Sequence, residues 1–157
     1  MPKPSQPSSP GQDLLRLDRQ LCFPLYAASR LVTRLYQPLL EPLGLTYPQY
    51  IVMMILWEDA PCTISHVCGR ALLNTNTLTP LLKRLEQSGY LTRNRKAEDE
   101  RVVWVALTDQ GAGLKAACAC VPETLAATLG YTEEALVTLK GLMDELVAHL
   151  RTLDPTP

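Results

Sequence analysis

The residues most able to do chemistry in this chain are five cysteines, at positions 22, 62, 68, 118 and 120. Cys22 lies in DRQLCFPLYAASR, a run with the pattern of an amphipathic helix, and Tyr26 follows one turn later, so both side chains can share a helix face. A cysteine often serves only as a small apolar residue, so packing is the alternative to a reactive thiol. An odd number of cysteines without regular spacing predicts thiols rather than a secreted disulfide framework.

A second group, Cys62, His66 and Cys68, has the residue types of a metal site. On a helix these three positions do not share one face, and no second pair of ligands follows them in the sequence. We therefore predict that the protein holds no metal, and nothing else in the sequence indicates a cofactor.

Composition and charge limit the class of protein. A chain of 157 residues with 46% apolar residues is enough for one domain, and a net charge of −1 confines any nucleic-acid contact to a local patch. The first twelve residues carry four prolines and no apolar run, which predicts a flexible arm rather than a signal peptide. Because the longest apolar run, residues 51–57, is far shorter than the roughly 20 residues that span a bilayer, we expect a cytoplasmic protein without a membrane partner.

Apolar residues at steps of three and four predict one long helix over residues 13–41, with a bend or restart near Pro24 and Pro38. A second helix is expected over residues 48–59, because Pro48 suits a first helical position. A short third helix over residues 64–71 would be capped by Thr63.

A fourth helix, capped by Thr75 or Asn76 and ending at Gly89, would bury one side through leucines at positions 78, 81, 82 and 85. Two short strands, residues 90–95 and 101–108, then flank the charged loop KAEDE and predict a hairpin. Thr108 would cap a helix that runs on toward residue 129, and a last helix follows to about residue 153. The expected fold is mainly α with a small β-wing.

A short helix, a turn and a second helix followed at once by a two-stranded wing are the layout of a winged helix-turn-helix. The second helix would enter the major groove, where Asn76, Thr79 and Lys83 can hydrogen-bond base edges or phosphates. Between residues 83 and 101, six basic and four acidic residues give a net charge of +2. Each feature alone is more typical of an ordinary solvated helix and a charged hairpin, but their consecutive order favours double-stranded DNA as a partner.

The sequence also resembles a known family. Similarity to the MarR family of dimeric bacterial repressors is carried by TLTPLLKRLEQSGYLTR, DERVVWVALTDQG and LGLTYPQYIVMMILWE. QLCFPLYAASR together with LTYPQY resembles the organic-hydroperoxide-sensing branch of that family, the OhrR regulators. The resemblance covers roughly residues 18–111 and implies a MarR-like dimer with a recognition helix over residues 75–88. In the wing, Asp99 and Arg101 match the aspartate and arginine that orient and insert into the minor groove.

Together, the polar helix face and the matched wing give the predicted DNA contacts, which are Asn74, Thr75, Asn76, Thr77, Thr79, Lys83, Arg84, Arg93, Arg95, Lys96, Asp99 and Arg101.

The resemblance places Cys22 at the peroxide-reactive cysteine and Tyr26, Tyr36 and Tyr47 at the tyrosines around it. Tyr36 is fourteen residues after Cys22, roughly 21 Å along a helix axis, so a direct contact requires a second chain. Phenol hydroxyls that donate to sulfur stabilise the thiolate, which is the form that attacks peroxides. Apolar residues beside Cys22 would favour a hydroperoxide with a hydrocarbon tail, since each buried CH₂ contributes about 0.8 kcal/mol.

The sequence departs from the family at the step after oxidation. In two-cysteine relatives the resolving cysteine lies shortly before the last helix, but here that segment reads ETLAATLGYT. Cys118 and Cys120 are the nearest substitutes; Cys118 lies on an apolar stripe, and Cys120 is the better candidate for exposure. Without a resolving cysteine, a sulfenic acid at Cys22 would pair with a low-molecular-weight thiol. Pro24 and Asn74 also depart from the family, whose members usually have alanine and aspartate there.

We therefore predict a homodimeric winged-helix repressor, not an enzyme, that releases its operator when an organic hydroperoxide oxidises Cys22. Its expected segments are a flexible arm (1–12), an N-terminal dimerisation helix (13–45), a DNA-binding domain (46–111) and C-terminal dimerisation helices (112–157). One alternative is a MarR-type repressor relieved by a small aromatic or phenolic ligand, with Cys22 only packing. Another is a thiol peroxidase, which the absence of a βαβ pattern and the presence of a wing disfavour.

Overall fold

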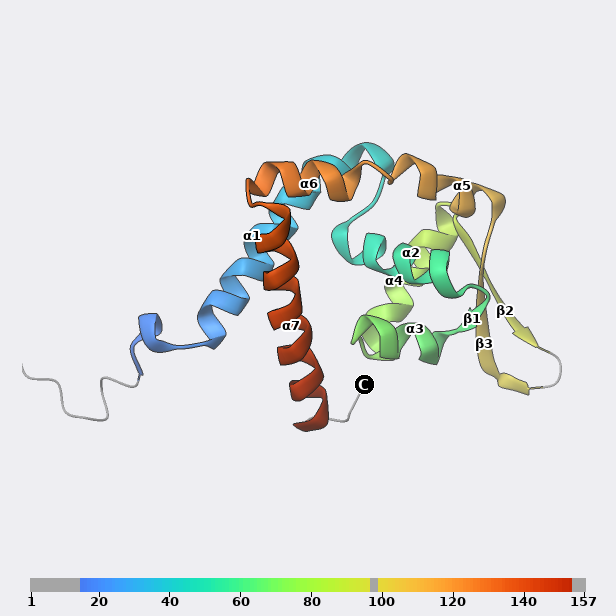
Figure 1. Ribbon diagram of the computed structural model, residues 1–157. Coiled ribbons are helices and arrows are strands. Elements are labelled where there is room, and N and C mark those ends of the chain that lie inside the picture. The colour runs from blue at the N-terminus through green and yellow to red at the C-terminus, as the bar shows by residue number, and fades with distance from the viewer. Residues whose placement is uncertain (1–14, 97–98, 154–157) are drawn as a thin grey trace, which may run out of the picture. The chain divides into compact units, whose positions relative to one another are not determined.

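The computed structural model describes residues 15–96 and 99–153 (Figure 1), so the predicted arm over residues 1–12 lies outside the described residues. Contacts divide the chain into two compact units, with the boundary between Leu35 and Tyr36 inside helix α1 (Cys22–Leu40). The first unit contains the short 3₁₀ helix η2 (Leu17–Arg19) and most of α1.

Helix α1 begins at Cys22, so the prediction of a helix from residue 13 was wrong. Pro24 is the physical reason: in a longer helix it would leave the Gln20 carbonyl without a donor and clash with it. Gln20 instead has an extended backbone, with φ −89° and ψ 120°, and Pro24 lies in the first turn, where a missing N–H costs nothing. The expected restart near Pro24 is therefore confirmed, and Cys22 occupies the first helical position. Pro38 is accommodated inside the last turn of α1.

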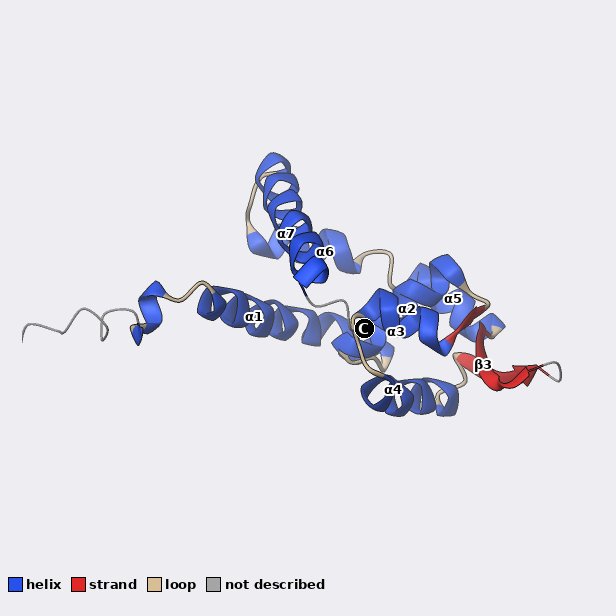
Figure 2. Ribbon diagram, turned by 90° about the horizontal axis from the view of Figure 1, so that it is seen from below, coloured by secondary structure: helices blue, strands red, loops and turns tan. Residues whose placement is uncertain are grey.

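The second unit continues with a mostly helical series and one small sheet, coloured red in Figure 2, which confirms the predicted fold class. Its further elements are η3 (Glu41–Leu43), α2 (Tyr47–Asp59), β1 (Cys62–Thr63), α3 (Ile64–Ala71), α4 (Thr75–Gln87), β2 (Leu91–Lys96), β3 (Asp99–Leu107), α5 (Asp109–Ala117), α6 (Val121–Leu129) and α7 (Glu133–Leu153).

Side-chain caps fix the starts of the helices around the turn. Thr63 caps α3 as predicted, because its Oγ1 accepts from the N–H of His66 at 3.1 Å. The cap of α4 is Asn74, not Thr75 or Asn76: Asn74 Oδ1 accepts from the N–H of Thr77 at 2.9 Å. A short amide side chain at the position just before the helix satisfies one of its free N–H groups, so Asn74 is a structural residue as well as a candidate DNA contact.

The wing is an antiparallel hairpin to which a third, two-residue strand is added. The strand order is β1-β3-β2, with Arg93 opposite Val105 in the β2–β3 pair and a register shift between Arg95 and Lys96. Strand β1 pairs Cys62 with Val105 and was not predicted, because two residues carry no periodicity to recognise. The hairpin itself is confirmed, and Figure 1 shows its two long strands side by side.

The predicted single helix over residues 108–129 is wrong, since the structure has α5 and α6 with a break at residues 118–120. Thr108 caps α5 as expected, accepting from the N–H of Gly111 at 3.0 Å. Pro122 explains the break, because within a continuous helix its ring would clash with the Cys118 carbonyl. Pro122 instead lies in the first turn of α6, and both Cys118 and Cys120 fall in the connection.

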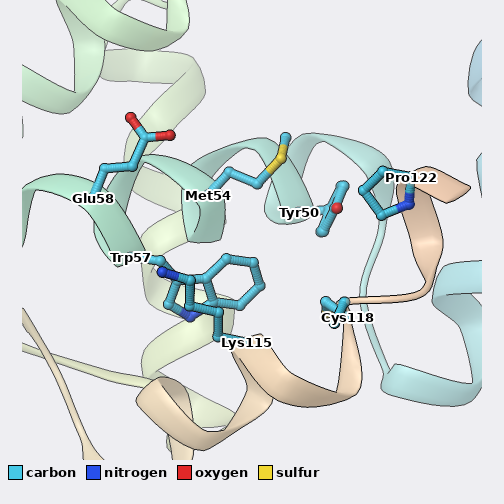
Figure 3. Close-up of a pocket in the computed structure, with 8 residues that line it drawn as sticks. Tyr50, Met54, Trp57, Glu58, Lys115, Cys118 and Pro122 are labelled. Carbon is cyan, nitrogen blue, oxygen red and sulfur yellow. The ribbon is translucent and has the colours of Figure 1, made fainter. Parts of the chain in front are cut away.

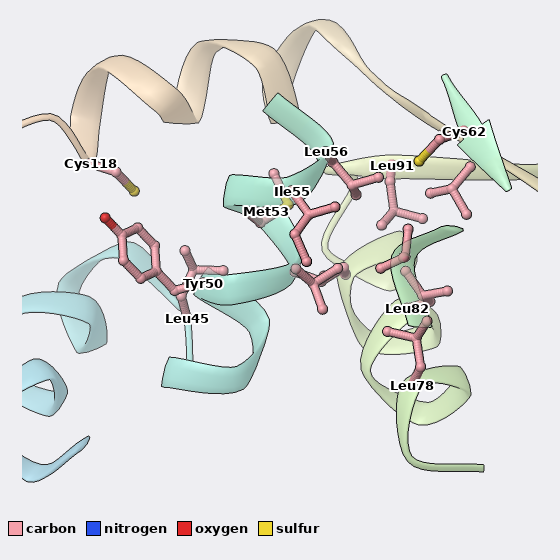
Figure 4. Close-up of a cluster of buried hydrophobic side chains, with 14 of the residues drawn as sticks. Leu45, Tyr50, Met53, Ile55, Leu56, Cys62, Leu78, Leu82, Leu91 and Cys118 are labelled. Atoms are coloured by element: carbon pink, nitrogen blue, oxygen red, sulfur yellow. The ribbon is translucent and has the colours of Figure 1, made fainter. Parts of the chain in front are cut away.

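The core of the second unit lies between α2, α4 and the sheet (Figure 4). Leu78, Leu82 and Leu85 are fully buried, so three of the four leucines predicted to face inward do so, and Leu81 is half-buried. Helix α2 contributes Val52, Met53 and Leu56, and the sheet contributes Leu91 and Val105. This core holds the outward face of α4 in a fixed direction relative to the hairpin.

Across the described residues, no single helix combines the length and hydropathy needed to cross a membrane. Residues 22–43 and 47–59 satisfy that test only as a pair, and the pair is bent by 72° at its break.

Candidate DNA interface and thiol site

The polar face of α4 is exposed as predicted. Asn76, Thr79 and Lys83 all lie on the solvent side, opposite the buried leucines. Thr79 Oγ1 donates to the Thr75 carbonyl at 2.7 Å, so this hydroxyl is partly engaged within the helix. No described residue pairs with the side chains of Asn76, Lys83 or Arg84, which leaves two positive charges and one amide available to an external partner. The bordering residues Asn74, Thr75, Thr77 and Arg84 are exposed as well.

Arg93 differs from the other predicted DNA contacts. Its side chain is only 25% exposed and forms an ion pair with Glu86, with Nη2 2.6 Å from Oε2. The recognition helix therefore already holds the Arg93 guanidinium, and a direct contact between Arg93 and DNA stays a prediction. Arg95, Lys96, Asp99 and Arg101 lie in the strands of the hairpin, but their side chains fall outside the described ones.

Cys22 is exposed in the first turn of α1, and Tyr26, one turn later, is 62% exposed. The residues that precede and follow Cys22, Leu21 and Phe23, are 70% and 40% exposed. A thiol on such a surface is accessible to small molecules, and the apolar side chains beside it suit an apolar one. Within the first unit, Tyr26 is the tyrosine that shares the helix with Cys22 over one turn.

The other predicted tyrosines form a ring cluster in the second unit. Tyr36 at the end of α1 packs on Tyr47 at the start of α2, with ring centroids 4.5 Å apart and an interplanar angle of 30°. Burial, followed by the neighbouring Tyr47, raises the pKa of Tyr36 to about 12, and burial also raises the pKa of Tyr47. Both phenols therefore keep their protons at physiological pH and remain hydrogen-bond donors.

Two aromatic residues that the sequence reasoning missed extend this cluster. The ring centroids of Tyr50 and Tyr36 are 5.9 Å apart. Those of Tyr50 and Trp57 are 6.2 Å apart, in an edge-on arrangement. Trp57 Nε1 donates to the carbonyl of Gly111 at 2.9 Å, which ties α2 to the start of α5. The spacing of Tyr47, Tyr50 and Trp57, at steps of three and seven, is a signal that could have placed them on one helix face.

A pocket of about 210 Å³ lies between α2 and the α5–α6 segment (Figure 3). Aromatic and apolar groups make most of its wall, with Glu58 and Lys115 as its charged members. The lining residues are Tyr50, Met54, Trp57, Glu58, Lys115, Cys118, Ala119 and Pro122.

The remaining cysteines are mostly buried. Cys118 is 3% exposed, and Figure 4 shows the Tyr50 hydroxyl pointing toward its sulfur. Burial, followed by the nearby Cys120, raises the pKa of the Cys118 thiol, so this group stays protonated and unreactive at neutral pH. The predicted burial of Cys118 and exposure of Cys120 are both confirmed. Cys62 and Cys68 are buried too, and burial also raises the pKa of Cys62.

The residue types that suggested a metal site are used otherwise. His66 Nε2 lies 2.7 Å from Asp59 Oδ2 on the surface. Within residues 15–96 and 99–153, no group of three or more histidine, cysteine or acidic side chains could hold a metal ion.

Fold and exposed α4 face define the class of the protein: a winged helix-turn-helix DNA-binding protein. Comparison with known proteins refines this class. The family model of the transcriptional regulators SarA/Rot matches residues 34–118, more than half of the chain. An organic hydroperoxide resistance transcriptional regulator from Bacillus subtilis (strain 168) is 44% identical over 90% of this chain and 94% of its own length. The HTH-type transcriptional regulator TtmR from Methylorubrum extorquens (strain PA1) is 43% identical over 94% of this chain and 78% of its own.

Among solved structures, AbfR of Staphylococcus epidermidis, in its reduced form bound to DNA, matches with a TM-score of 0.76 and 38% identity. The match covers 91% of this chain and 98% of the AbfR chain. AbfR has also been solved overoxidised on DNA and in a disulfide-bonded form. The chain belongs to the MarR-type family of winged-helix transcriptional regulators, in the branch of the organic hydroperoxide resistance regulators. It is a DNA-binding regulator rather than an enzyme, so the thiol peroxidase alternative is set aside.

Proposed function

We propose that this protein is a homodimeric cytoplasmic repressor that binds a double-stranded DNA operator and releases it when an organic hydroperoxide oxidises Cys22. The observation that carries the proposal is the placement of Cys22: an accessible thiol on α1, fourteen residues and roughly 21 Å of helix before Tyr36. A thiol so far along the helix from the half-buried phenols meets them only if a second chain supplies them.

The dimer follows from apolar surface that one chain leaves open. On α7, Val137, Leu142 and Leu150 are 65%, 56% and 49% exposed, and on α1 Leu31 is 58% exposed. Large apolar faces on two helices are typical of an interface that a second copy covers. We assign the segments 13–45 and 112–157 to dimerisation and 46–111 to DNA binding.

Cys22 is the proposed site of a two-electron oxidation. The thiolate attacks one peroxide oxygen, an S–O bond forms, the O–O bond breaks, and the alkoxide leaves and takes up a proton as an alcohol. Sulfur is oxidised by two electrons to a sulfenic acid while the hydroperoxide is reduced. The sulfenic acid then condenses with a small thiol, with loss of water, to give a mixed disulfide. The protonated phenols of Tyr36 and Tyr47 from the partner would donate to the thiolate and hold it ready.

Relatives support oxidation of a cysteine as the input. AbfR has been solved reduced, overoxidised and disulfide-bonded, and the Bacillus subtilis relative is named for organic hydroperoxide resistance. The exposed Leu21 and Phe23 beside Cys22 favour a hydroperoxide with a hydrocarbon group over hydrogen peroxide.

The test is operator binding by the full chain before and after oxidation, on a duplex selected from a random pool by the reduced wild-type protein. Cumene hydroperoxide with a small thiol should abolish binding by the wild type, and dithiothreitol should restore it. After the same treatment, Cys22→Ser should keep its operator affinity. The matched variant Cys120→Ser should lose operator binding as the wild type does. Release from Cys22→Ser at the same peroxide dose would refute the proposal.

A second candidate function has one specific observation in its favour, the pocket beside Tyr50 and Trp57. In that case a small aromatic or phenolic ligand would relieve repression and Cys22 would only pack. Trp57 reports on the pocket directly in a Trp104→Phe background, which leaves it as the single tryptophan of the two in the chain. Benzoate or phenol should then quench the Trp57 fluorescence. If the same ligand also releases the operator from the Cys22→Ser variant, the ligand-relieved repressor is favoured.

A further inference from the structure

Three hydrogen bonds join the carboxylate of Glu86, near the end of α4, to Arg93 on β2. Glu86 Oε1 accepts from the backbone N–H of Arg93 at 3.0 Å, and Oε2 accepts from Nε at 3.0 Å and from Nη2 at 2.6 Å. The two side chains are 34% and 25% exposed, so water screens the pair only in part. The Arg93 guanidinium also holds the pKa of the Glu86 carboxyl below its usual range, so the carboxylate is ionised at neutral pH.

This pair spans the bend between the recognition helix and the wing. Helix α4 ends at Gln87 and β2 begins at Leu91, and Gly89 between them has a φ of +78°, a conformation that favours glycine. Strand β2 is at the edge of the sheet, where outward N–H groups have no strand partner. Because Glu86 accepts from one of these N–H groups, it fastens the backbone of β2, and not only a side chain, to α4.

The other side of the same bend is held by Thr108. Its Oγ1 donates to the Gly89 carbonyl at 2.6 Å, and its N–H donates to the Tyr90 carbonyl at 3.1 Å. The root of the wing is therefore fixed to β3 on one side and to α4 on the other. The tie to α4 depends on side-chain ionisation. Without it, α4 and β2 stay joined by the bend at Gly89, by the hydrogen bond from the Tyr90 N–H to the Leu85 carbonyl at 3.0 Å and by the buried Leu85 and Leu91.

We propose that Glu86 and Arg93 are positioning residues that set the angle of the wing to the recognition helix, so that the hairpin tip and α4 reach DNA together. This inference rests on the proposed DNA surface of α4 and the wing. It assigns Arg93 a role in affinity without a contact to a phosphate, since its forked donor groups are already used by Glu86.

Simple electrostatics predicts the opposite sign for Glu86. Loss of a negative charge beside a DNA surface should strengthen binding. If Glu86 instead holds the wing in place, its neutral variant should weaken binding although the protein becomes less negative. The sign of this change separates a positioning role from that of a solvated surface acid.

The experiment measures operator affinity of the reduced full chain, on the wild-type-selected duplex, for Glu86→Gln, Arg93→Gln and the double variant. Each single variant should bind roughly tenfold more weakly, and the double variant no more weakly than either single one, because one interaction is lost in all three. The slope of log K against log salt should equal that of the wild type, since no phosphate contact is removed. Hydroxyl-radical protection should be lost at the outer positions reached by the wing and kept in the central major-groove contacts.

Glu123→Gln on α6 is the matched control, with the same change in charge at an exposed site far from α4 in sequence, and should bind as the wild type. If Glu86→Gln lowers the thermal midpoint, Arg93→Lys tests the same inference. Lysine keeps the positive charge but lacks the two parallel N–H donors of the guanidinium, so this variant should also bind the operator more weakly. Unchanged or tighter binding by Glu86→Gln, or a shallower salt slope for Arg93→Gln, would overturn the inference. Loss of binding by Lys83→Ala in the same assay would show that α4 contacts DNA, even if the Glu86–Arg93 pair does not position the wing.

Discussion

The rings of Tyr36 and Tyr47 pack with their centroids 4.5 Å apart, although Tyr36 lies four residues before the end of α1 and Tyr47 is the first residue of α2. Both phenols are half-buried, and burial raises the pKa of Tyr36 to about 12 from an ordinary value of 10.0. In this protonated state the two hydroxyls can donate to a neighbouring thiolate, which is the role that the proposed sensing site gives them.

The raised pKa of Tyr36 predicts a loss of stability in alkali. The folded protein keeps the Tyr36 proton more tightly than the unfolded chain, so stability is fully present below pH 10 and falls as the pH rises from 10 toward 12. Tyr36→Phe should therefore show a smaller decrease in thermal midpoint between pH 9 and 11.5 than the wild type, measured by circular dichroism. Tyr131→Phe, which removes a phenol that is 61% exposed, is the control and should leave the decrease unchanged. Identical pH profiles for wild type and Tyr36→Phe would contradict the assignment.

Lys83→Ala should weaken operator binding and make its salt dependence shallower. A lysine that neutralises one phosphate contributes about 0.9 to the slope of log K against log salt, so the slope should decrease by roughly that amount for each subunit. Lys140→Ala, at an exposed lysine paired with Asp144 on α7, removes the same charge and should change neither quantity. A wild-type slope in Lys83→Ala would place the DNA surface elsewhere.

The glycines of α5 should respond in opposite directions to alanine. A Cβ at Gly111 would lie 1.8 Å from the Tyr90 carbonyl oxygen. Gly111→Ala should therefore lower the free energy of unfolding by roughly 2–4 kcal/mol. A Cβ at Gly113 meets nothing within 4 Å, and Gly113→Ala should raise the same free energy by about 0.5–1 kcal/mol. Urea denaturation of both variants measures the difference. Equal destabilisation by the two substitutions would mean that α5 does not pack against Tyr90 as described.

Much of this architecture could be predicted because its signals are local. The leucine period of α4, the cap at Thr63 and the turn-flanked hairpin each depend on a few neighbouring residues. The family resemblance then assigned roles to Cys22 and Tyr36 that spacing alone did not give.

The features that the sequence did not reveal are of two kinds. Some helix starts depend on which of two local effects is stronger, and some contacts join residues that are far apart in the chain. Pro24 and Pro122 each decided where a helix starts. A restart near Pro24 was expected, but the apolar pattern continues through residue 122 and concealed the break there. The pairing of Cys62 with Val105 and the hydrogen bond from Trp57 to Gly111 join residues far apart in the chain. Arg93 looked like a DNA cation because its bond to Glu86 exists only once Gly89 has turned the chain back.

The fate of oxidised Cys22 gives a further prediction. Cys118 is buried and no cysteine lies in residues 123–132. If the exposed Cys120 is also structural, peroxide alone should release DNA poorly and peroxide with a small thiol should release it well. A mixed disulfide adds bulk that α1 must move to accommodate, whereas a sulfenic acid adds a single oxygen. Non-reducing electrophoresis with mass mapping after peroxide alone should show monomers. A covalent dimer that disappears in Cys120→Ser or Cys118→Ser would establish an intersubunit bridge instead.

The central claim, that each sensing pocket joins Cys22 of one subunit to Tyr36 of the other, is tested most directly in mixed dimers. One chain carries Cys22→Ser and the other Tyr36→Phe, with different affinity tags to isolate the heterodimer. A shared pocket places both defects together and leaves the second pocket intact, so one thiol per heterodimer should react with cumene hydroperoxide at the wild-type rate. The Tyr36→Phe homodimer is the reference for slow reaction. A heterodimer whose remaining thiol reacts only at that slow rate would show that Cys22 and Tyr36 act within one chain, contrary to this account.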